Sequence, residues 1–260
     1  MNKSLAIARI IIWMVVGVMA SLVLISAVAT DNGFFDGNRT PWYGGIKASP
    51  TNEELVEGSV NDIIINWVSG DINIVKNENS KAIRVVQEGR IRDGQQMLVN
   101  KIGDALHIEE GKKHVFNLFY FGSDLTVYLP EKIYNLIQIN TVAGDIGGNI
   151  ECKVLEVEAI SSDITVDGDI KNVKINTVSG DIKLSSVTML ESFAVATVSG
   201  DITLTIPENS GFSSRFSKMS GDFSTNFDTT KTGNTYVYKN GTAKFTTETV
   251  SGDMRINRRR

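Results

Sequence analysis

Apolar and polar residues alternate along most of the chain after residue 30, in short runs that share one organising string. An alternation with a period of two places every second side chain on the same face of a strand, so these runs predict β-strands. The string reads apolar, Ser or Ala, Gly or Ser, Asp, apolar, and it occurs seven times. Its central residues are Gly70, Gly144, Ser162, Gly180, Gly200, Gly221 and Gly252. From 144 to 221 the centres recur every 18 to 21 residues, which identifies an internal repeat.

The alternation changes phase at the centre of each repeat. The apolar residues Val173 and Ile175 lie at odd offsets before Gly180, whereas Ile182 and Leu184 lie at even offsets after it. A change of phase requires a bulge or a corner, and glycine suits such a place because it can adopt a positive φ. We therefore expect Ser-Gly-Asp to form a tight turn, which the Asp side chain closes with a local hydrogen bond. The alternative is a straight strand, with Val, Gly, Ile and Leu facing inward and Thr, Ser and Asp forming an outer polar row.

A repeat of 18 to 21 residues is too short to bury its own apolar face, so neighbouring copies have to stack around one core. The predicted fold is all-β: a parallel β-solenoid over residues 59–256. Antiparallel hairpins in a sandwich are the alternative, but they would not require a nearly constant spacing. Residues 76–130 do not follow the spacing of the repeat, and we expect them to form a cap or insertion. Short strands are predicted there at 82–86, 97–99, 106–108, 115–121 and 125–129.

Residues 10–29 form an uncharged, apolar run of 20 residues. As a helix this run would measure about 30 Å, the thickness of the hydrocarbon core of a bilayer. Lys3 and Arg9 precede it, so the positive-inside rule predicts a cytoplasmic N-terminus at 1–9 and export of everything after residue 30. We interpret the run as a single-pass transmembrane anchor. A cleaved signal peptide is the alternative, since residues 27–29 read Ala-Val-Ala, although the run is longer than the usual signal core.

The flanking segments and the charge add to this picture. Residues 30–58 are rich in Gly, Pro, Asn and Asp and are predicted to be a linker. The net charge is −4, and the acidic residues concentrate in the body of the chain, which argues against nucleic acid as a partner. Residues 257–260 form a basic tail, which we expect to be solvated. The single cysteine, Cys152, rules out an internal disulfide framework.

With its TVSGDI-type repeats behind one N-terminal membrane segment, the chain resembles the bacterial "putative adhesin" family of β-strand repeat proteins. The resemblance covers roughly residues 58–256 and rests on the style of the repeat. It implies a β-helix-like ectodomain of unknown function, with no established catalytic residues to transfer. Some members of that family sit beside cell-envelope stress-response systems, so the resemblance also implies a place in the cell envelope.

The aspartates of the repeat are its one systematic polar feature: Asp71, Asp145, Asp163, Asp181, Asp201, Asp222 and Asp253. In stacked copies neighbouring carboxylates would lie about 4.8 Å apart and repel one another. We expect backbone N–H groups at the turns to offset this repulsion. Bound Ca²⁺ is the alternative, but each repeat offers only one carboxylate at this position, whereas calcium takes several oxygen ligands.

No catalytic, cofactor-binding or metal-binding residue is predicted. The two histidines, His107 and His114, lie in the irregular segment, and Ser161-Ser162-Asp163 has no histidine nearby in the sequence. Glycoside hydrolysis requires two carboxyl groups that converge on one bond. The acidic residues of this chain instead repeat at intervals along the sequence. The GxGxxG and Walker patterns of phosphate-binding loops are absent. We therefore predict a protein that is not an enzyme and carries no cofactor.

Three functional hypotheses follow. The first is a membrane-anchored extracytoplasmic binding or scaffold module, adhesin-like, that presents a long flat face to a cell-envelope polymer or protein. The second is an exported β-helix enzyme that acts on polysaccharide, for which measurable cleavage would be the evidence. The third is a sensor or modulator of an envelope stress system, which capture of a membrane kinase or regulator would favour.

Overall fold

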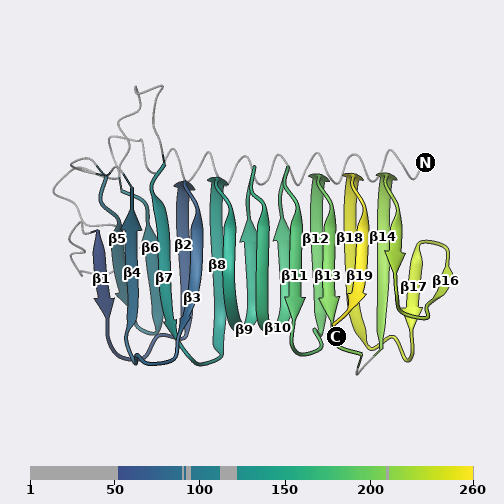
Figure 1. Ribbon diagram of the computed structural model, residues 1–260, viewed down its shortest axis with the longest axis horizontal. Helices are drawn as coiled ribbons and strands as arrows, with labels where there is room; N and C mark the ends of the chain where they lie inside the picture. The colour runs from purple at the N-terminus through teal and green to yellow at the C-terminus, as the bar shows by residue number, and fades with distance from the viewer. Residues whose placement is uncertain (1–51, 90, 92–94, 112–121, 209–210, 260) are drawn as a thin grey trace.

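The computed structural model describes residues 52–259, except 90, 92–94, 112–121 and 209–210 (Figure 1). The regular structure of this part of the chain is nineteen β-strands. They are β1 (Glu53–Val56), β2 (Asp62–Ser69), β3 (Ile72–Asn77), β4 (Ile83–Glu88), β5 (Leu98–Ile102), β6 (Ala105–Glu109), β7 (Asp124–Pro130), β8 (Tyr134–Ala143), β9 (Ile146–Glu158), β10 (Ile164–Asn176), β11 (Ile182–Ser186), β12 (Ser192–Ser199), β13 (Ile202–Ile206), β14 (Phe212–Ser220), β15 (Phe223–Thr225), β16 (Thr230–Thr232), β17 (Thr235–Tyr238), β18 (Ala243–Ser251) and β19 (Met254–Arg258). Among the described residues no helix has the length and apolar character needed to span a bilayer. The predicted transmembrane segment, residues 10–29, and the predicted strand at 115–121 lie outside the described residues.

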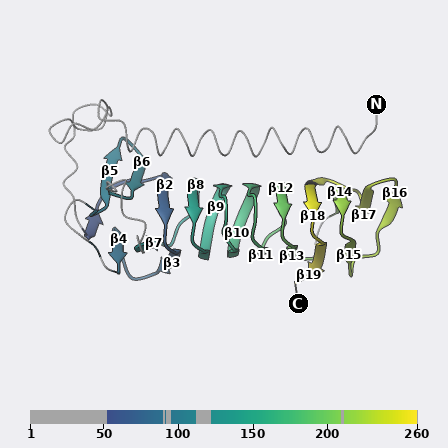
Figure 2. The ribbon, with the colours of Figure 1, turned by 90° about the horizontal axis from the view of Figure 1, so that it is seen from above.

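Each repeat supplies one coil of two strands, so the molecule consists of two sheets that face each other across one core (Figure 2). The first sheet contains the strands that precede the repeat centres, with β5, β17 and β16 added at its ends, in the spatial order β5-β6-β2-β8-β9-β10-β12-β18-β14-β17-β16. The second sheet contains the strands that follow the centres, with β1 and β4 added at one end, in the order β1-β4-β7-β3-β9-β10-β11-β13-β19-β15. The long strands β9 and β10 bend and take part in both sheets. Neighbouring coils pair in parallel, which gives a solenoid-like stack and not a series of hairpins.

The core follows the predicted phase on both sides of the regular repeat centres, as the repeat around Gly180 shows. Val173 and Ile175 before Gly180, and Ile182 and Leu184 after it, are all buried. The chain turns a corner at the centre, since Thr177 is buried whereas the next residue along the chain is only half-buried. The alternative of a strand running straight through Ser-Gly-Asp is therefore wrong.

The corner glycines allow neighbouring coils to stack closely. Gly200 has a φ of +130°, a conformation that residues with a Cβ rarely adopt. A Cβ on Gly200 would also collide with the carbonyl oxygen of Gly180 on the neighbouring coil. Glycine is needed here for two separate reasons, the backbone conformation and the space.

The interruption at 76–130 contains one further coil as well as capping strands. Strand β6 pairs in parallel with β2, and β7 pairs in parallel with β3. Strands β5, β4 and β1 then pair antiparallel at this end, β5 with β6, β4 with β7 and β1 with β4. The segment at 76–130 therefore extends the stack by one coil and adds antiparallel strands at its end.

The boundaries of the predicted linker and tail need correction. Residues 53–56, assigned to the linker, form β1, because pairing with β4 orders a segment whose first three residues are exposed and therefore show no apolar period. The basic tail also begins later than predicted, because β19 continues to Arg258.

Chain order and spatial order differ near both ends of the stack (Figure 1). The coil β2–β3 lies between β6–β7 and β8–β9, although it precedes both in sequence. The coil β18–β19, the last in the chain, lies between β12–β13 and β14–β15. The last described strand, β19, accordingly lies beside β13 and not at the outer end of the stack.

Candidate functional site

One edge of the stack carries a row of eight aspartates, which we call the aspartate edge. In spatial order it consists of Asp124, Asp71, Asp145, Asp163, Asp181, Asp201, Asp253 and Asp222. Seven of these residues were found from the repeat. Asp124 was missed because Gly122 and Ser123 stand in reversed order before it. The buried Leu125 and Val127, at the usual even offsets, are the signal that could have identified it.

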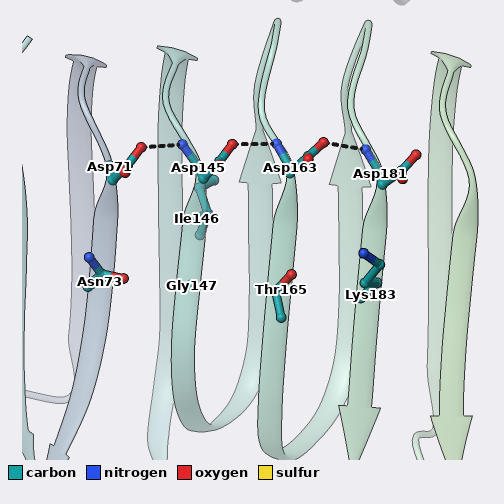
Figure 3. A pocket seen from close by; sticks show the side chains of 9 residues that line it. All are labelled: Asp71, Asn73, Asp145, Ile146, Gly147, Asp163, Thr165, Asp181 and Lys183. Atoms are coloured by element: carbon teal, nitrogen blue, oxygen red, sulfur yellow. Dashed lines mark hydrogen bonds between the residues drawn. The ribbon is translucent and has the colours of Figure 1, made fainter.

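Hydrogen bonds between coils hold this row together. The backbone N–H of Asp163 donates to Oδ1 of Asp145 at 3.1 Å, and the N–H of Asp181 donates to Oδ1 of Asp163 at 2.8 Å (Figure 3). Seven such bonds, of 2.7 to 3.1 Å, link the eight residues into a continuous ladder. The expectation that backbone N–H groups bind these carboxylates is confirmed. The expectation of a local bond within each turn is wrong, because the donor belongs to the neighbouring coil, which stacking brings into reach.

Two shallow hollows lie on the second sheet beside the aspartate edge, the first mainly polar and the second mainly apolar in its lining. The first has a volume of about 230 Å³, and its floor is open because Gly147 has no side chain between Asn73 and Thr165 (Figure 3). Its full lining is Asp71, Asn73, Asp145, Ile146, Gly147, Asp163, Thr165, Asp181 and Lys183. The second hollow, of about 250 Å³, shares Thr165 and Lys183 with the first and extends to Thr205. Together they form a continuous open surface that offers carboxylate, hydroxyl, amide and ammonium groups.

The carboxylates form a line and do not converge. Within the described ranges no three or more His, Cys, Asp or Glu side chains are grouped so that they could hold a metal ion. Oδ1 of each aspartate from Asp124 to Asp253 in the spatial order already accepts a backbone N–H. The row therefore forms a repeating polar surface along one edge of the stack.

The other candidate residues of the sequence lie apart from one another. His107 is on β6, separated from the coil of Ser161 by β2 and β8, and partial burial lowers the pKa of its imidazole. Burial raises the pKa of the Cys152 thiol to about 12, so this thiol stays protonated and unreactive. Ser161 is exposed at the edge. His114 lies outside the described residues.

The end of the chain binds back onto the second hollow. Arg259 Nη1 donates to Oδ1 of Asp167 and to Oγ of Ser185, both at 2.7 Å. This guanidinium lowers the pKa of the Asp167 carboxyl. Arg258 forms ion pairs with Glu208 at 3.3 Å and with Asp228 at 3.4 Å. The expectation of a solvated tail is therefore wrong for both arginines, because the inserted position of β19 places them beside acids of the body.

The fold and the site define the class of protein: an all-β, solenoid-like stack with a regular polar edge and open hollows. The chain belongs to the Toastrack DUF4097 family, whose model matches residues 60–192 and 167–257. This membership supports the resemblance to adhesin-like β-strand repeat proteins.

One solved structure shows the same fold. A "putative cell adhesion protein" from Clostridium sporogenes superposes with a TM-score of 0.51 and 12% identity, covering 81% of this chain and 100% of that chain. A "putative adhesin" from Bacteroides fragilis gives a TM-score of 0.36 and 14% identity, covering 82% of this chain and 100% of that chain. At 12% identity the likeness to the Clostridium protein concerns the fold alone. No curated protein matches the chain.

Proposed function

We propose that the protein is a non-enzymatic, adhesin-like binding or scaffold module of the cell envelope. Residues 10–29 anchor it in the membrane as a single span, and residues 31–260 face outward. The observation that carries the binding role is the open surface formed by the polar aspartate edge and the two hollows beside it. The anchoring role rests on the uncharged run and the basic residues Lys3 and Arg9 that precede it.

The regular spacing of this surface favours an extended partner. Coils of a parallel stack follow one another at about 4.8 Å, so eight of them extend for roughly 34 Å along the edge. A partner that is itself a chain, such as an envelope polysaccharide or an extended polypeptide, can repeat the same weak contact on successive coils. Lys183, Thr165 and Asn73 supply hydrogen-bonding groups next to the carboxylates. The affinity then comes from many modest contacts and not from one deep pocket.

The geometry gives less support to an enzyme that acts on polysaccharide. Retaining and inverting glycosidases require two carboxyl groups on opposite sides of one bond in a cleft. The carboxylates of the aspartate edge share one side of the stack and bind backbone N–H groups. A link to envelope stress signalling would use the same surface, with a regulatory protein as the partner.

Binding can be tested with the full-length protein in detergent on an array of envelope polysaccharides, with release of soluble fragments measured in parallel. We expect retention without release. Lys183→Glu should weaken binding, because it adds a negative charge to the lining of both hollows. Lys174→Glu is the matched control, since Lys174 is also exposed but lies on β10 in the first sheet. Equal loss in both variants would contradict the assigned surface, and fragment release would contradict the non-enzymatic role.

A further inference from the structure

The coil β18–β19 is held between two coils that precede it in the chain. On one side β18 pairs in parallel with β12, from Ser192–Lys244 to Ser199–Ser251. On its other side β18 pairs in parallel with β14, and β19 likewise lies between β13 and β15. Residues 243–258 thus fill a slot that has a hydrogen-bonding strand edge on each of its walls.

The slot is also filled on its inner side. Phe245 of β18 lies between Phe193 and Phe212, with ring centroids at 6.1 Å and 5.3 Å respectively. Met254 and Ile256 of β19 are completely buried. The segment therefore contributes part of the core between the two walls, and an empty slot would expose apolar surface and unpaired strand edges.

The order of synthesis leaves this slot open until residues 243–258 have been made. Both walls, at 192–206 and 212–225, precede the segment that separates them. Until residues 243–258 arrive, the walls can accept any segment with the same register and apolar pattern. The equivalent segment of a neighbouring copy has both, because it is identical.

The connection to the segment is short and conformationally unfavourable. Only residues 239–242 join β17 to β18. Lys239 has a φ of +49° and is the only described residue other than glycine with a positive φ. A short hinge under strain favours the open form, in which the segment leaves its own body, and thereby favours exchange.

We propose that residues 243–258 exchange between two copies of this chain when the copies fold side by side. The strands β18–β19 of one copy then fill the slot between β12–β13 and β14–β15 of the other. Reciprocal exchange closes a two-fold dimer with the same hydrogen bonds as the monomer, so it requires no new binding surface. The contact of Arg259 with Asp167 and Ser185 then forms between copies as well.

A pair of single cysteines on separate copies tests this arrangement. Ala194 on β12 and Thr246 on β18 are direct partners in register and both are exposed. Adjacent strands at about 4.8 Å fall within the Cα separation that a disulfide spans. Full-length Ala194→Cys and full-length Thr246→Cys, with different tags, are co-expressed and oxidised in the membrane. We expect a disulfide-linked heterodimer that carries both tags on a non-reducing gel.

The matched control places Lys174→Cys and Ala194→Cys on separate copies. These residues are also exposed partners in register, but β10 and β12 belong to consecutive coils that no exchange separates. A heterodimer no more abundant than in this control overturns the proposal. A double variant that carries both Ala194→Cys and Thr246→Cys in one chain should form an internal disulfide. If this disulfide does not form, the register between β12 and β18 on which the proposal rests is contradicted. Lys239→Gly, which relieves the hinge, should reduce the heterodimer several-fold.

Discussion

At the residue scale, the inward positions next to the corners carry the stability of the stack. Ile182 is completely buried and lies in register between Ile164 and Ile202 of the neighbouring coils. Ile182→Asp would bury an unpaired carboxylate there, and we expect destabilisation on the order of 3–5 kcal/mol or complete unfolding. Urea denaturation followed by circular dichroism measures this effect. Lys183→Asp, one residue further on and exposed, should change stability little; equal melting of wild type and Ile182→Asp would contradict the inward assignment.

The corner glycines give a second residue-scale prediction. Gly200→Ala should destabilise by about 3 kcal/mol or more, because the methyl group meets the carbonyl oxygen of Gly180 and the φ of +130° becomes strained. Gly233 is the matched control: its φ of +60° is also positive, but nothing lies within 4 Å of an added Cβ. Gly233→Ala should therefore cost only about 1 kcal/mol, from the backbone alone. Similar melting temperatures for the two variants would show that the coils are not stacked as closely as described.

The aspartate edge gives the third prediction. Asp163, Asp181 and Asp201 form a surface ladder held by backbone hydrogen bonds, so millimolar Ca²⁺ and EDTA should give the same melting curve. Asp181→Asn keeps an acceptor oxygen for the N–H of Asp201 and should be close to neutral, whereas Asp181→Ala should lose about 1 kcal/mol. A rise of several degrees with Ca²⁺, abolished by Asp181→Asn, would instead make the row a metal-dependent binding surface.

At the element scale, the sequence predicts the strands inside a coil better than the order of the coils. The pleat fixes a period of two, so the buried faces of β10 and β11 follow directly from the positions of Val, Ile and Leu. The string around each centre is nearly the same in every coil. It therefore identifies which strands are equivalent, but it does not show which coils lie next to one another in space. The insertion of β18–β19 and the inter-coil partners of the aspartates therefore required the structure. Strand β1 was missed because it is ordered by its pairing with β4 and not by an apolar pattern of its own.

The end of β19 gives a prediction for the pH dependence of stability. Arg259 lowers the pKa of Asp167 in the folded state, so the ion pair stabilises the fold above the ordinary pKa of Asp. This contribution is lost as the pH falls through the lowered folded-state value. Arg259→Ala should lower the melting temperature at pH 7 by no more than about 2 °C, because both side chains are partly exposed.

The same variant is informative in acid. The difference between wild type and Arg259→Ala should shrink as the pH falls below roughly 4 and disappear once Asp167 is protonated. Asp167→Asn should reproduce the effect at pH 7, and the double variant should add nothing further. A difference that persists unchanged at pH 2 would show that packing of the Arg259 side chain, and not its charge, holds the end of β19.

At the scale of the whole molecule, the polar groups of the described residues are spread along the stack and are not gathered at one point that a sequence pattern could identify. Catalytic sites gather different residue types at one point, and such a constellation can leave a motif in the sequence. In the described part of this chain the polar groups instead repeat along an edge, and the repeat alone says nothing about what binds there. Composition and periodicity therefore predict an open binding surface, while the chemistry of the partner has to come from binding experiments.

The orientation of the molecule in the membrane gives the last prediction. Residues 10–29 are uncharged, and Lys3 and Arg9 precede them, so the body should lie outside the cytoplasmic membrane with a short N-terminus inside. Protease added to intact cells, after removal of an outer membrane where the host has one, should digest a C-terminal tag while an N-terminal tag stays protected and membrane-bound. An N-terminal tag that is missing from the mature protein would identify a cleaved signal peptide. A body that is protected in spheroplasts but digested in lysates would place it in the cytoplasm and overturn both the anchor and the envelope function that depends on it.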